Sequence, residues 1–482
     1  MNFTPIDEIP KIREVLRNTF RKGVTRPLAW RKHQLLQLAR LTQENADAFA
    51  NALAADLGKP RLEAFLGEVG PVFERALACA EKLEDWAKPT QVEVPVWQKS
   101  WNPTVYKRSK GTVLIISPWN YPMILSLQPL YGAISAGCCA VIKVSEIAPN
   151  YGELLARLLP RYLDPSAYRV ILGGIPEVTR LLELQWDHMV RYFSVFYTGN
   201  GRVARIIAAA AAKHLTPLTL ELGGKSPVIV DGTFDIALAA KRMLWGKITN
   251  AGQICVAPDF VLVLREKQEE LAAALKVAHD SFYPEGALDS MSRIISDTHH
   301  KRLKGLLERT QGKIVFGGRT DEKRGFEPTI VKDVSEGDSL LEEEIFGPIL
   351  PLVPVDSVED AIEFISSRDN PLVLYAFTED GKTKDALIER TTSGNLVFND
   401  VFQQLSVNEL PFGGVGESGY GRQVLRYSYD NFVYDRACLD IPRSAESDLA
   451  VRYPPYTDDK LSFFTSPPLN TKVSESVNST SH

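Results

Sequence analysis

The sequence predicts an α/β protein made of two Rossmann-like, doubly wound lobes and a small β arm. A length of 482 residues suggests two or three domains, and a hydrophobic content of 44% is enough to bury a large core. Short β-branched runs alternate with helical patterns along most of the chain. This alternation is typical of parallel sheets covered by helices.

The N-terminal region, residues 6–87, has a helical pattern, because apolar residues recur three and four positions apart. Gly58 and Pro60 are expected to end one of its helices. Residues 91–107 change to strict alternation, with valines at every second position from Val92 to Val96. This change predicts an exposed two-stranded excursion.

The first lobe follows, with short apolar runs of the kind that form strands buried on both faces of a sheet. The strands expected here are 111–118, 139–143, 168–172 and 193–197, and the helices are 124–136, 153–159 and 178–184.

The second lobe begins near residue 227 and extends to about residue 432. Its expected strands are 227–230, 260–264, 349–355 and 394–398, and its expected helices are 268–281, 299–309 and 358–366. The end of the chain is rich in Ser, Thr, Asn and Pro, so we expect residues 461–482 to be a disordered tail.

The composition gives no support for a nucleic-acid or membrane partner. Lys and Arg total 55 against 60 for Asp and Glu, so the net charge of −5 does not favour nucleic acid or anionic membranes. No secretory signal and no apolar stretch of roughly 18 residues is visible, so no stable membrane anchor is expected.

The five cysteines are odd in number and form no pair of CxxC knuckles. We therefore expect no metal site and a reducing, cytoplasmic location.

A glycine-containing turn at residues 197–204 fits the dinucleotide pattern G-x-G-x-x-G/A, with Gly199 as its first glycine. Glu221 lies about 20 residues further on, where the motif expects an acid that binds ribose. The alternative is an ordinary turn between a strand and a helix. Glu221 itself stands between a strand and a pair of glycines, which argues for a different role.

Four separated strings resemble the NAD(P)-dependent aldehyde dehydrogenases. They are residues 118–122 (PWNYP), 220–227 (LELGGKSP), 252–255 (GQIC) and 344–348 (EIFGP). Further phrases resemble the class 3 branch, which acts on fatty and aromatic aldehydes: 214–217 (HLTP), 257–259 (APD), 410–414 (LPFGG) and 452–456 (RYPPY). The resemblance implies oxidation of a medium- or long-chain aliphatic or aromatic aldehyde to the acid, with NAD or alternatively NADP, by a homodimer.

The resemblance assigns three residues to catalysis. Cys255 would be the nucleophile that makes the aldehyde tetrahedral and then carries the acyl group as a thioester. Asn120 would stabilise the oxyanion together with the Cys255 N–H. Glu221 would activate the water that hydrolyses the thioester, with a pKa raised by its apolar surroundings. Each residue has a structural alternative: Cys255 could be a small buried thiol, Asn120 a helix N-cap, and Glu221 a capping or ion-paired acid.

The cofactor residues implied by the resemblance are Trp119, Lys143, Glu146, Gly199, Gly223, Glu344 and Phe346. Lys143 and Glu146 would contact the adenosine ribose, and Glu146 would favour NAD by repelling a 2′-phosphate. Glu344 and Phe346 would hold the nicotinamide ribose and ring. A solvated Lys–Glu pair and an ordinary core phenylalanine are the alternatives.

The resemblance also divides the chain. It implies an NAD(P)-binding domain (1–85 and 108–222), a catalytic domain (223–432), an oligomerisation arm (86–107 and 433–460) and a disordered tail (461–482).

Residues 189–195 depart from the class 3 pattern, because they intervene before the strand that leads to Gly199. We expect either a bulge ahead of that strand or a foreign segment that shifts its register. Two alternative functions follow from the sequence. An acyl-CoA-forming enzyme is disfavoured by Glu221, and a catalytically silent binding protein is disfavoured by the presence of Cys255, Asn120 and Glu221.

Overall fold

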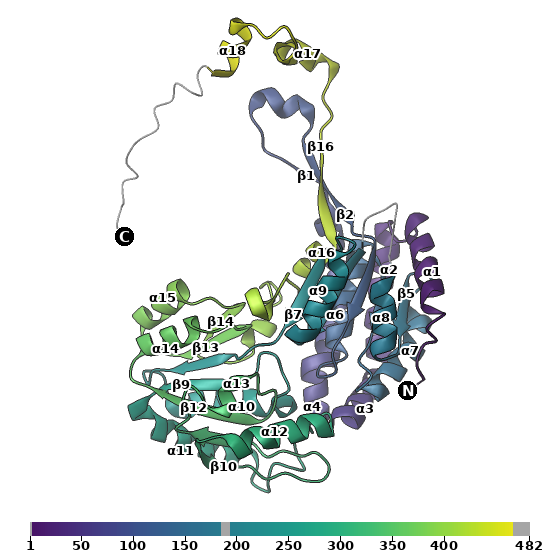
Figure 1. Ribbon diagram of the computed structural model, residues 1–482. Helices are drawn as coiled ribbons and strands as arrows, with labels where there is room; N and C mark the ends of the chain where they lie inside the picture. Colours follow the sequence, from purple (N-terminus) through teal and green to yellow (C-terminus); the bar gives the residue numbers. More distant parts are fainter. Residues whose placement is uncertain (1, 185–192, 466–482) are drawn as a thin grey trace. The chain divides into compact units, whose positions relative to one another are not determined.

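The computed structural model describes residues 2–184 and 193–465 (Figure 1). The chain divides into two units. The larger comprises Met1–Ala87 and Arg108–Tyr434, and the smaller comprises Lys88–Lys107 and Asp435–His482.

The N-terminal region of the larger unit is helical, as its periodicity predicts. Its elements are α1 (Ile9–Arg21), α2 (Leu28–Glu44), α3 (Ala46–Leu57), α4 (Arg61–Ala64), the π-helix η1 (Phe65–Val69) and α5 (Gly70–Ala87). The predicted stop after α3 is confirmed, because Gly58 caps that helix with a φ of 64°. A left-handed residue at this position is the usual way to end a helix, and glycine adopts it without steric conflict.

A six-stranded sheet forms the centre of the first lobe, in the order β15-β7-β6-β3-β4-β5. Its strands are β3 (Thr112–Ile116), β4 (Cys139–Lys143), β5 (Tyr168–Ile171), β6 (Phe193–Gly199), β7 (Leu218–Leu222) and β15 (Gly419–Tyr420). All neighbours pair in parallel except β15, which is antiparallel to β7. The strand order reverses between β3 and β6, and such a reversal is where doubly wound sheets bind ligands.

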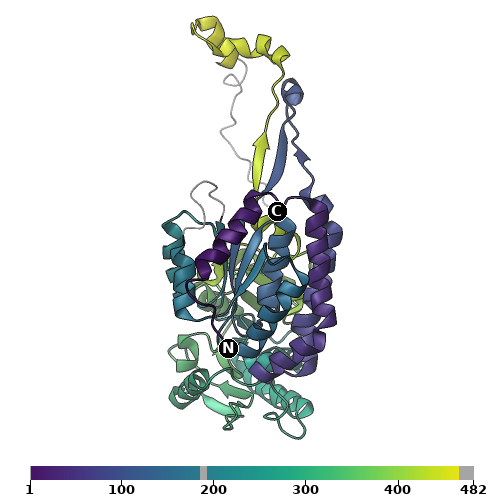
Figure 2. The same cartoon turned by 90° about the vertical axis from the view of Figure 1, so that its right-hand side faces the viewer.

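Helices cover both faces of this sheet. The connecting helices are α6 (Ile124–Ala136), α7 (Pro149–Tyr162), α8 (Ile175–Glu183) and α9 (Gly201–Ala212). Figure 2 shows α1, in dark purple, on one side of the sheet and α2 and α5 on the opposite side. There, α2 packs against α5, α6 and α7, so it forms a second layer outside the crossover helices.

The unusual segment ahead of β6 falls partly outside the described residues, which resume at residue 193. From Phe193 to Tyr197 the strand pairs continuously with β3, and from Val195 to Gly199 with β7, without a bulge. Most of the segment for which a bulge or a shifted register was expected lies outside the described residues, so that expectation stays a prediction.

A seven-stranded sheet forms the centre of the second lobe, in the order β10-β11-β12-β9-β8-β13-β14. Its strands are β8 (Pro227–Val230), β9 (Phe260–Leu264), β10 (Lys313–Phe316), β11 (Thr329–Lys332), β12 (Ile349–Val355), β13 (Val373–Phe377) and β14 (Asn395–Phe398). Its longer helices are α10 (Ile236–Ile248), α11 (Gln268–Phe282), α12 (Asp297–Arg309), α14 (Val358–Ser366) and α15 (Gly381–Arg390). The short elements of this lobe are η3 (Thr249–Gly252), η4 (Arg265–Lys267), α13 (Ser339–Glu342) and η5 (Gln403–Leu405). Two later short elements pack on the first lobe instead: η6 (Gly416–Ser418) against β7, and α16 (Arg426–Asn431) against α6.

The smaller unit contains a three-stranded sheet in the order β1-β2-β16. Its elements are β1 (Thr90–Gln91), η2 (Val96–Trp101), β2 (Thr104–Ser109), β16 (Val433–Cys438), η7 (Arg443–Ala445), α17 (Glu446–Leu449), η8 (Ala450–Arg452) and α18 (Asp458–Thr465).

Two expectations for this unit need correction. The alternating valines do not form a long strand: β1 has only two residues, and Val96 begins the 3-10 helix η2. Pro95 explains the difference, because it cannot donate a hydrogen bond to a neighbouring strand. The tail expected from residue 461 begins inside a helix, since residues 461–465 belong to α18; residues 466–482 lie outside the described residues.

No helix within residues 2–184 and 193–465 is long and apolar enough to span a bilayer.

Candidate active site

The residues singled out by the sequence come from two sets of loops. In the first lobe they lie at or beyond the carboxyl ends of β3, β4, β6 and β7: Trp119, Asn120, Lys143, Glu146, Gly199, Glu221 and Gly223. In the second lobe they lie ahead of strands, with Cys255 before β9, and Glu344 and Phe346 before β12.

The loop that carries Cys255 has an uncommon backbone conformation. Asn250, Ala251 and Gly252 have φ values of 50°, 53° and 72°, so three consecutive residues are left-handed. For the two that are not glycine this conformation is strained, and such strain persists only where the surroundings impose it. At Gly252 a Cβ would lie 2.3 Å from the Gly347 carbonyl oxygen, so no other residue fits there.

Hydrogen bonds from Asn250 hold this loop in place. Its backbone N–H donates to a carboxylate oxygen of Glu63 at 2.9 Å, and its Nδ2 donates to the carbonyl oxygens of Asn120 at 3.0 Å and Gln253 at 3.1 Å. Burial raises the pKa of Glu63. The hydrogen bond from the Asn250 N–H and the charge of the nearby Lys59 lower it in part. The loop is thus tied to both α4 and the turn after β3.

Asn120 reaches the same loop with its side chain. The buried Nδ2 donates to the carbonyl oxygen of Gln253 at 3.0 Å, two residues before Cys255. Asn120 does not act as the N-cap of α6, which was its alternative role. Glu68 accepts the hydrogen bonds from the first N–H groups of that helix, at Met123 and Ile124. Asn120 therefore has a free amide hydrogen to direct toward a ligand beside Cys255.

Glu221 is a buried carboxylate on β7, with 3% of its surface exposed. Neither side-chain oxygen has a hydrogen-bond partner among the described residues. Burial raises the pKa of Glu221 well above its ordinary value, and Arg422 opposes this only in part. The structure therefore does not support the alternative roles of Glu221 as a capping residue or as a member of an ion pair. A desolvated carboxylate with a raised pKa is suited to accept a proton.

Cys255 differs from the other thiols in its setting. Cys79, Cys138 and Cys139 are buried and Cys438 is exposed, whereas Cys255 is partly exposed. Burial, together with the nearby carboxylates of Glu344 and Glu221, raises the pKa of the Cys255 thiol to about 12. In this state the thiol is protonated at neutral pH, so its reaction as a nucleophile requires a base.

The loop that carries Glu344 and Phe346 is braced from two sides. Lys225 forms an ion pair with Asp259 and donates to the carbonyl oxygens of Leu340 and Glu343, both at 2.9 Å. Asp259 in turn accepts the backbone N–H of Ile345 at 2.9 Å.

Glu344 lies against the glycine pair that follows β7. A Cβ on Gly223 would lie 2.3 Å from a Glu344 carboxylate oxygen, and the Gly224 N–H donates to the same side chain. Burial and the nearby Asp259 raise the pKa of Glu344 to about 8.

Aromatic rings stand beside Glu344. The Phe346 ring meets that of Trp119 edge to face, with 5.4 Å between centroids, and the His299 ring lies 5.3 Å from Trp119 on another side. Burial lowers the pKa of His299, assisted by the charge of Arg302. The three rings form one aromatic cluster, and Phe346 lies two residues along the chain from Glu344.

The remaining predicted cofactor residues lie along the carboxyl edge of the six-stranded sheet. Lys143, at the end of β4, has a buried ammonium that donates to Glu146 at 3.1 Å and to the Val144 carbonyl at 2.7 Å. Burial lowers the pKa of Lys143, while Glu146 raises it. Gly199 ends β6, and a Cβ there would lie 2.2 Å from the Tyr197 hydroxyl. The structure thus places these residues on one edge but in separate turns.

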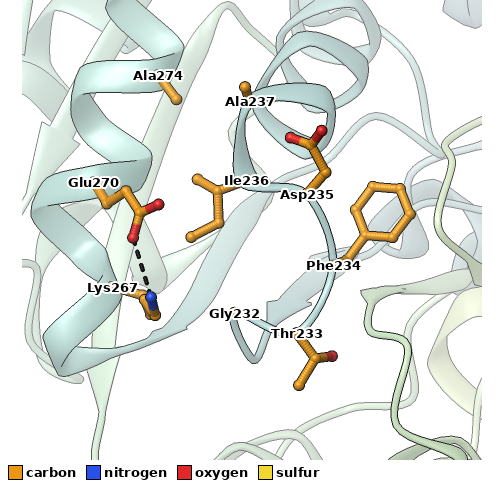
Figure 3. Close-up of a pocket in the computed structure, with 9 residues that line it drawn as sticks. All are labelled: Gly232, Thr233, Phe234, Asp235, Ile236, Ala237, Lys267, Glu270 and Ala274. Carbon is orange, nitrogen blue, oxygen red and sulfur yellow. Dashed lines mark hydrogen bonds and ion pairs between the residues drawn. The ribbon is translucent and has the colours of Figure 1, made fainter.

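A surface pocket in the second lobe lies apart from all these residues. Figure 3 shows it between α10 and α11, lined in part by Phe234, Asp235 and an ion pair of Lys267 with Glu270 at 3.1 Å. It contains none of the residues predicted from the sequence.

Sequence reasoning missed the residues that hold the site together, above all Glu63, Glu68, Lys59 and Asn250. Only Asn250 had a signal, its closeness to the string at residues 252–255. The others lie in a helical region with no distinctive spacing.

Comparisons with known proteins show which family and which structures this chain resembles. Residues 7–437 match the profile of the aldehyde dehydrogenase family. Aldehyde dehydrogenase family 3 member B2 of Mus musculus is 44% identical over 444 residues, which cover 92% of this chain and 91% of the relative. Family 3 member A2 of Rattus norvegicus is 44% identical over 451 residues, covering 93% and 92%. The substrate-bound state of Staphylococcus aureus AldH superposes with a TM-score of 0.91 at 37% identity, covering 96% of this chain and 99% of that one.

Proposed function

The chain belongs to the aldehyde dehydrogenase family, and from this premise we propose that Cys255, Asn120 and Glu221 carry out its reaction. It is an NAD(P)-dependent aldehyde dehydrogenase, which oxidises an aldehyde to the carboxylic acid. Membership of the family favours this activity over the acyl-CoA-forming and catalytically silent alternatives. One observation supports the residue assignment best: the amide of Asn120 and the unpartnered carboxylate of Glu221 both lie near the Cys255 loop.

The reaction begins with attack of the Cys255 sulfur on the aldehyde carbon. A new C–S bond forms, the carbonyl oxygen becomes an oxyanion, and the thiol proton leaves. That proton passes to water, so this step does not depend on Glu221, which acts in the later hydrolysis. The Cys255 residue is partly exposed, whereas Cys79, Cys138 and Cys139 are buried.

The oxyanion needs fixed donors, because donors that need not reorganise stabilise a developing charge best. Asn120 supplies its free amide hydrogen, and the Cys255 backbone N–H supplies the second. The strained turn at residues 250–252 fixes the direction of this backbone group relative to Asn120.

Hydrolysis of the thioester releases the acid. Glu221, once deprotonated, takes a proton from a water molecule as its oxygen attacks the acyl carbon, and the C–S bond breaks to free the sulfur of Cys255. The water oxygen becomes part of the carboxylic acid.

The residues of the site fit a nicotinamide cofactor, which when bound accepts the hydride from the tetrahedral adduct. Gly223 leaves room that any Cβ would fill, directly beside the Glu344 carboxylate. Glu344 would accept hydrogen bonds from the nicotinamide ribose, and Phe346 and Trp119 would flank the ring. Lys143 and Glu146 would hold the adenosine ribose, with Gly199 beside the phosphates.

Substrate class and domain roles extend the proposal. We propose medium- or long-chain aliphatic or aromatic aldehydes as substrates. Residues 1–85 and 108–222 form the NAD(P)-binding domain, and residues 223–432 form the catalytic domain, which carries Cys255. Residues 86–107 and 433–460 form an oligomerisation arm. Exposed apolar side chains support the last role, since Val96 is 81% and Trp97 60% exposed. A homodimer is the expected assembly, and five unpaired thiols support a cytoplasmic location.

Absorbance of the reduced cofactor tests the assignment directly. Purified protein with NAD+ and hexanal should reduce the cofactor, Cys255→Ala should abolish this, and Cys438→Ala, which changes an exposed thiol, should leave it intact. Undiminished activity in Cys255→Ala would refute the thioester route. Cell fractionation checks the location, and a tagged chain that sediments with organelles would contradict it.

A further inference from the structure

A buried ion pair that takes no part in the steps above joins Lys59 and Glu68. Lys59 lies between α3 and α4, and Glu68 lies in the π-helix η1. Both side chains are fully buried, with 2.5 Å between Nζ and Oε1. Burying two charges is unfavourable unless further hydrogen bonds satisfy both groups. The groups that supply those hydrogen bonds indicate what the pair does.

Glu68 holds the start of α6. Its second carboxylate oxygen accepts the backbone N–H of Met123 at 2.8 Å and that of Ile124 at 3.3 Å. The helix has no side-chain cap within its own segment. A carboxylate at this end satisfies unpaired N–H groups and interacts favourably with the helix dipole.

Lys59 holds the residues just before that helix. Its Nζ donates to the Asn120 carbonyl at 3.2 Å and lies 3.8 Å from the centroid of the Tyr121 ring. Gly67 makes room for this ring, because a Cβ there would lie 2.9 Å from Tyr121 Cε1. The ammonium therefore has an acceptor in Glu68, one in Asn120 and an aromatic face in Tyr121.

The backbone that the pair holds is the one that presents the amide of Asn120. Its carbonyl accepts hydrogen bonds from Lys59 and Asn250, and its side chain reaches Gln253. The helix that begins four residues further on is fixed by Glu68. We propose that the buried Lys59–Glu68 pair is a positioning device that sets the Asn120 amide against Cys255. This inference rests on the oxyanion role proposed above for Asn120.

A double-mutant cycle separates positioning from general stability. We combine the neutral pair variant Lys59→Met/Glu68→Gln, which leaves no lone buried charge, with Asn120→Ala. Asn120→Ala should lower kcat by about 10²–10³-fold, the usual effect of losing an oxyanion donor. The pair variant should lower kcat by about 10–100-fold, because small misplacement of a catalytic group has effects of this size. Added to Asn120→Ala, it should lower kcat less than about threefold further, because its target is already absent.

The affinity for NAD+ and a control variant distinguish the positioning of Asn120 from a general loss of stability. The dissociation constant for NAD+ should stay within about twofold in the pair variant, since the pair touches none of the cofactor residues. Asp56→Asn is the matched control, because Asp56 caps α7 in the same way, accepting the N–H groups of Asn150 at 3.0 Å and Tyr151 at 2.9 Å. It should lower Tm without showing coupling to Asn120→Ala.

If the pair variant lowers kcat by the same factor in the parent and in Asn120→Ala, the inference is overturned, while the oxyanion role of Asn120 remains. An unchanged kcat in Asn120→Ala would instead refute the oxyanion role, and the inference with it. If the pair variant does not fold, Glu68→Asp keeps the charge and shortens the side chain, and its smaller loss of kcat should show the same dependence on Asn120. An additive loss in that cycle also overturns the inference.

Discussion

Replacing Glu221 by Gln should stabilise the folded protein at alkaline pH while it disables the enzyme. Glu221 is 3% exposed, and neither of its oxygens has a hydrogen-bond partner among the described residues. Its pKa in the folded state is raised by burial. A group with a raised folded pKa contributes stability that is fully present below the unfolded pKa and is lost as the pH rises through the folded pKa. The side chain therefore contributes less to the stability of the fold at pH 8 than near pH 4.5.

The size of the effect follows from the missing partners. A buried polar group without a partner costs about 1–3 kcal/mol, and more when it is charged. The amide of the variant retains part of this cost, so we expect a gain of about 1 kcal/mol at pH 8. That gain corresponds to a rise of about 1 °C in Tm for a chain of 482 residues, since the entropy of unfolding is about 2.1 cal/mol/K per residue.

Thermal unfolding at pH 8 and pH 5 measures this effect. Glu221→Gln should raise Tm at pH 8 and have a much smaller effect at pH 5. Glu322→Gln, which changes an exposed acid, should leave Tm unchanged at both values. A Glu221→Gln variant that is less stable than the parent at pH 8 would refute the conclusion that the carboxylate is buried without a partner.

Three further changes test other parts of the site. Gly223→Ala should raise the KM for NAD+ by about tenfold, because the new methyl would displace Glu344 from the place where we expect it to bind ribose; an unchanged KM in steady-state kinetics would contradict this. Glu146→Gln should raise kcat/KM for NADP+ about 3–10-fold with little change for NAD+, since it removes a charge next to a 2′-phosphate; an equal change for both cofactors would exclude that role. Trp97→Asp should halve the mass found by light scattering, because it puts a charge into the proposed dimer contact; a dimer of unchanged stability would argue against the arm.

Much of the fold could be predicted because parallel strands buried on both faces have a plain signature. The strands at Cys139–Lys143, Pro227–Val230 and Phe260–Leu264 have the bounds predicted from their continuous apolar runs. β13 is equally apolar and fully buried but was not predicted, although the Asn370–Pro371 pair just before it is a turn signal. α10 was missed because apolar residues occur on most of its sides, which hides the helical period.

The site could be predicted only where a string of residues carries it. Cys255, Glu221 and Asn120 stand in such strings, and the expected rise in the pKa of Glu221 agrees with its burial. Lys59 and Glu68 could not be found in this way. They are nine residues apart across a π-helix, and Lys59 contacts Asn120, 61 residues further along the chain. Contacts of this kind depend on tertiary packing and leave no periodic trace in the sequence.

The thioester on Cys255 is the central claim, and trapping it is the most direct test. Glu221→Gln should form the thioester and hydrolyse it about 10²–10⁴-fold more slowly than the parent. Mixed with NAD+ and hexanal, it should give a burst of one reduced cofactor per active site and then stop. Peptide mass spectrometry of the quenched variant should find a hexanoyl group on Cys255. Steady turnover without a burst, or an acyl group on another residue, would contradict the account.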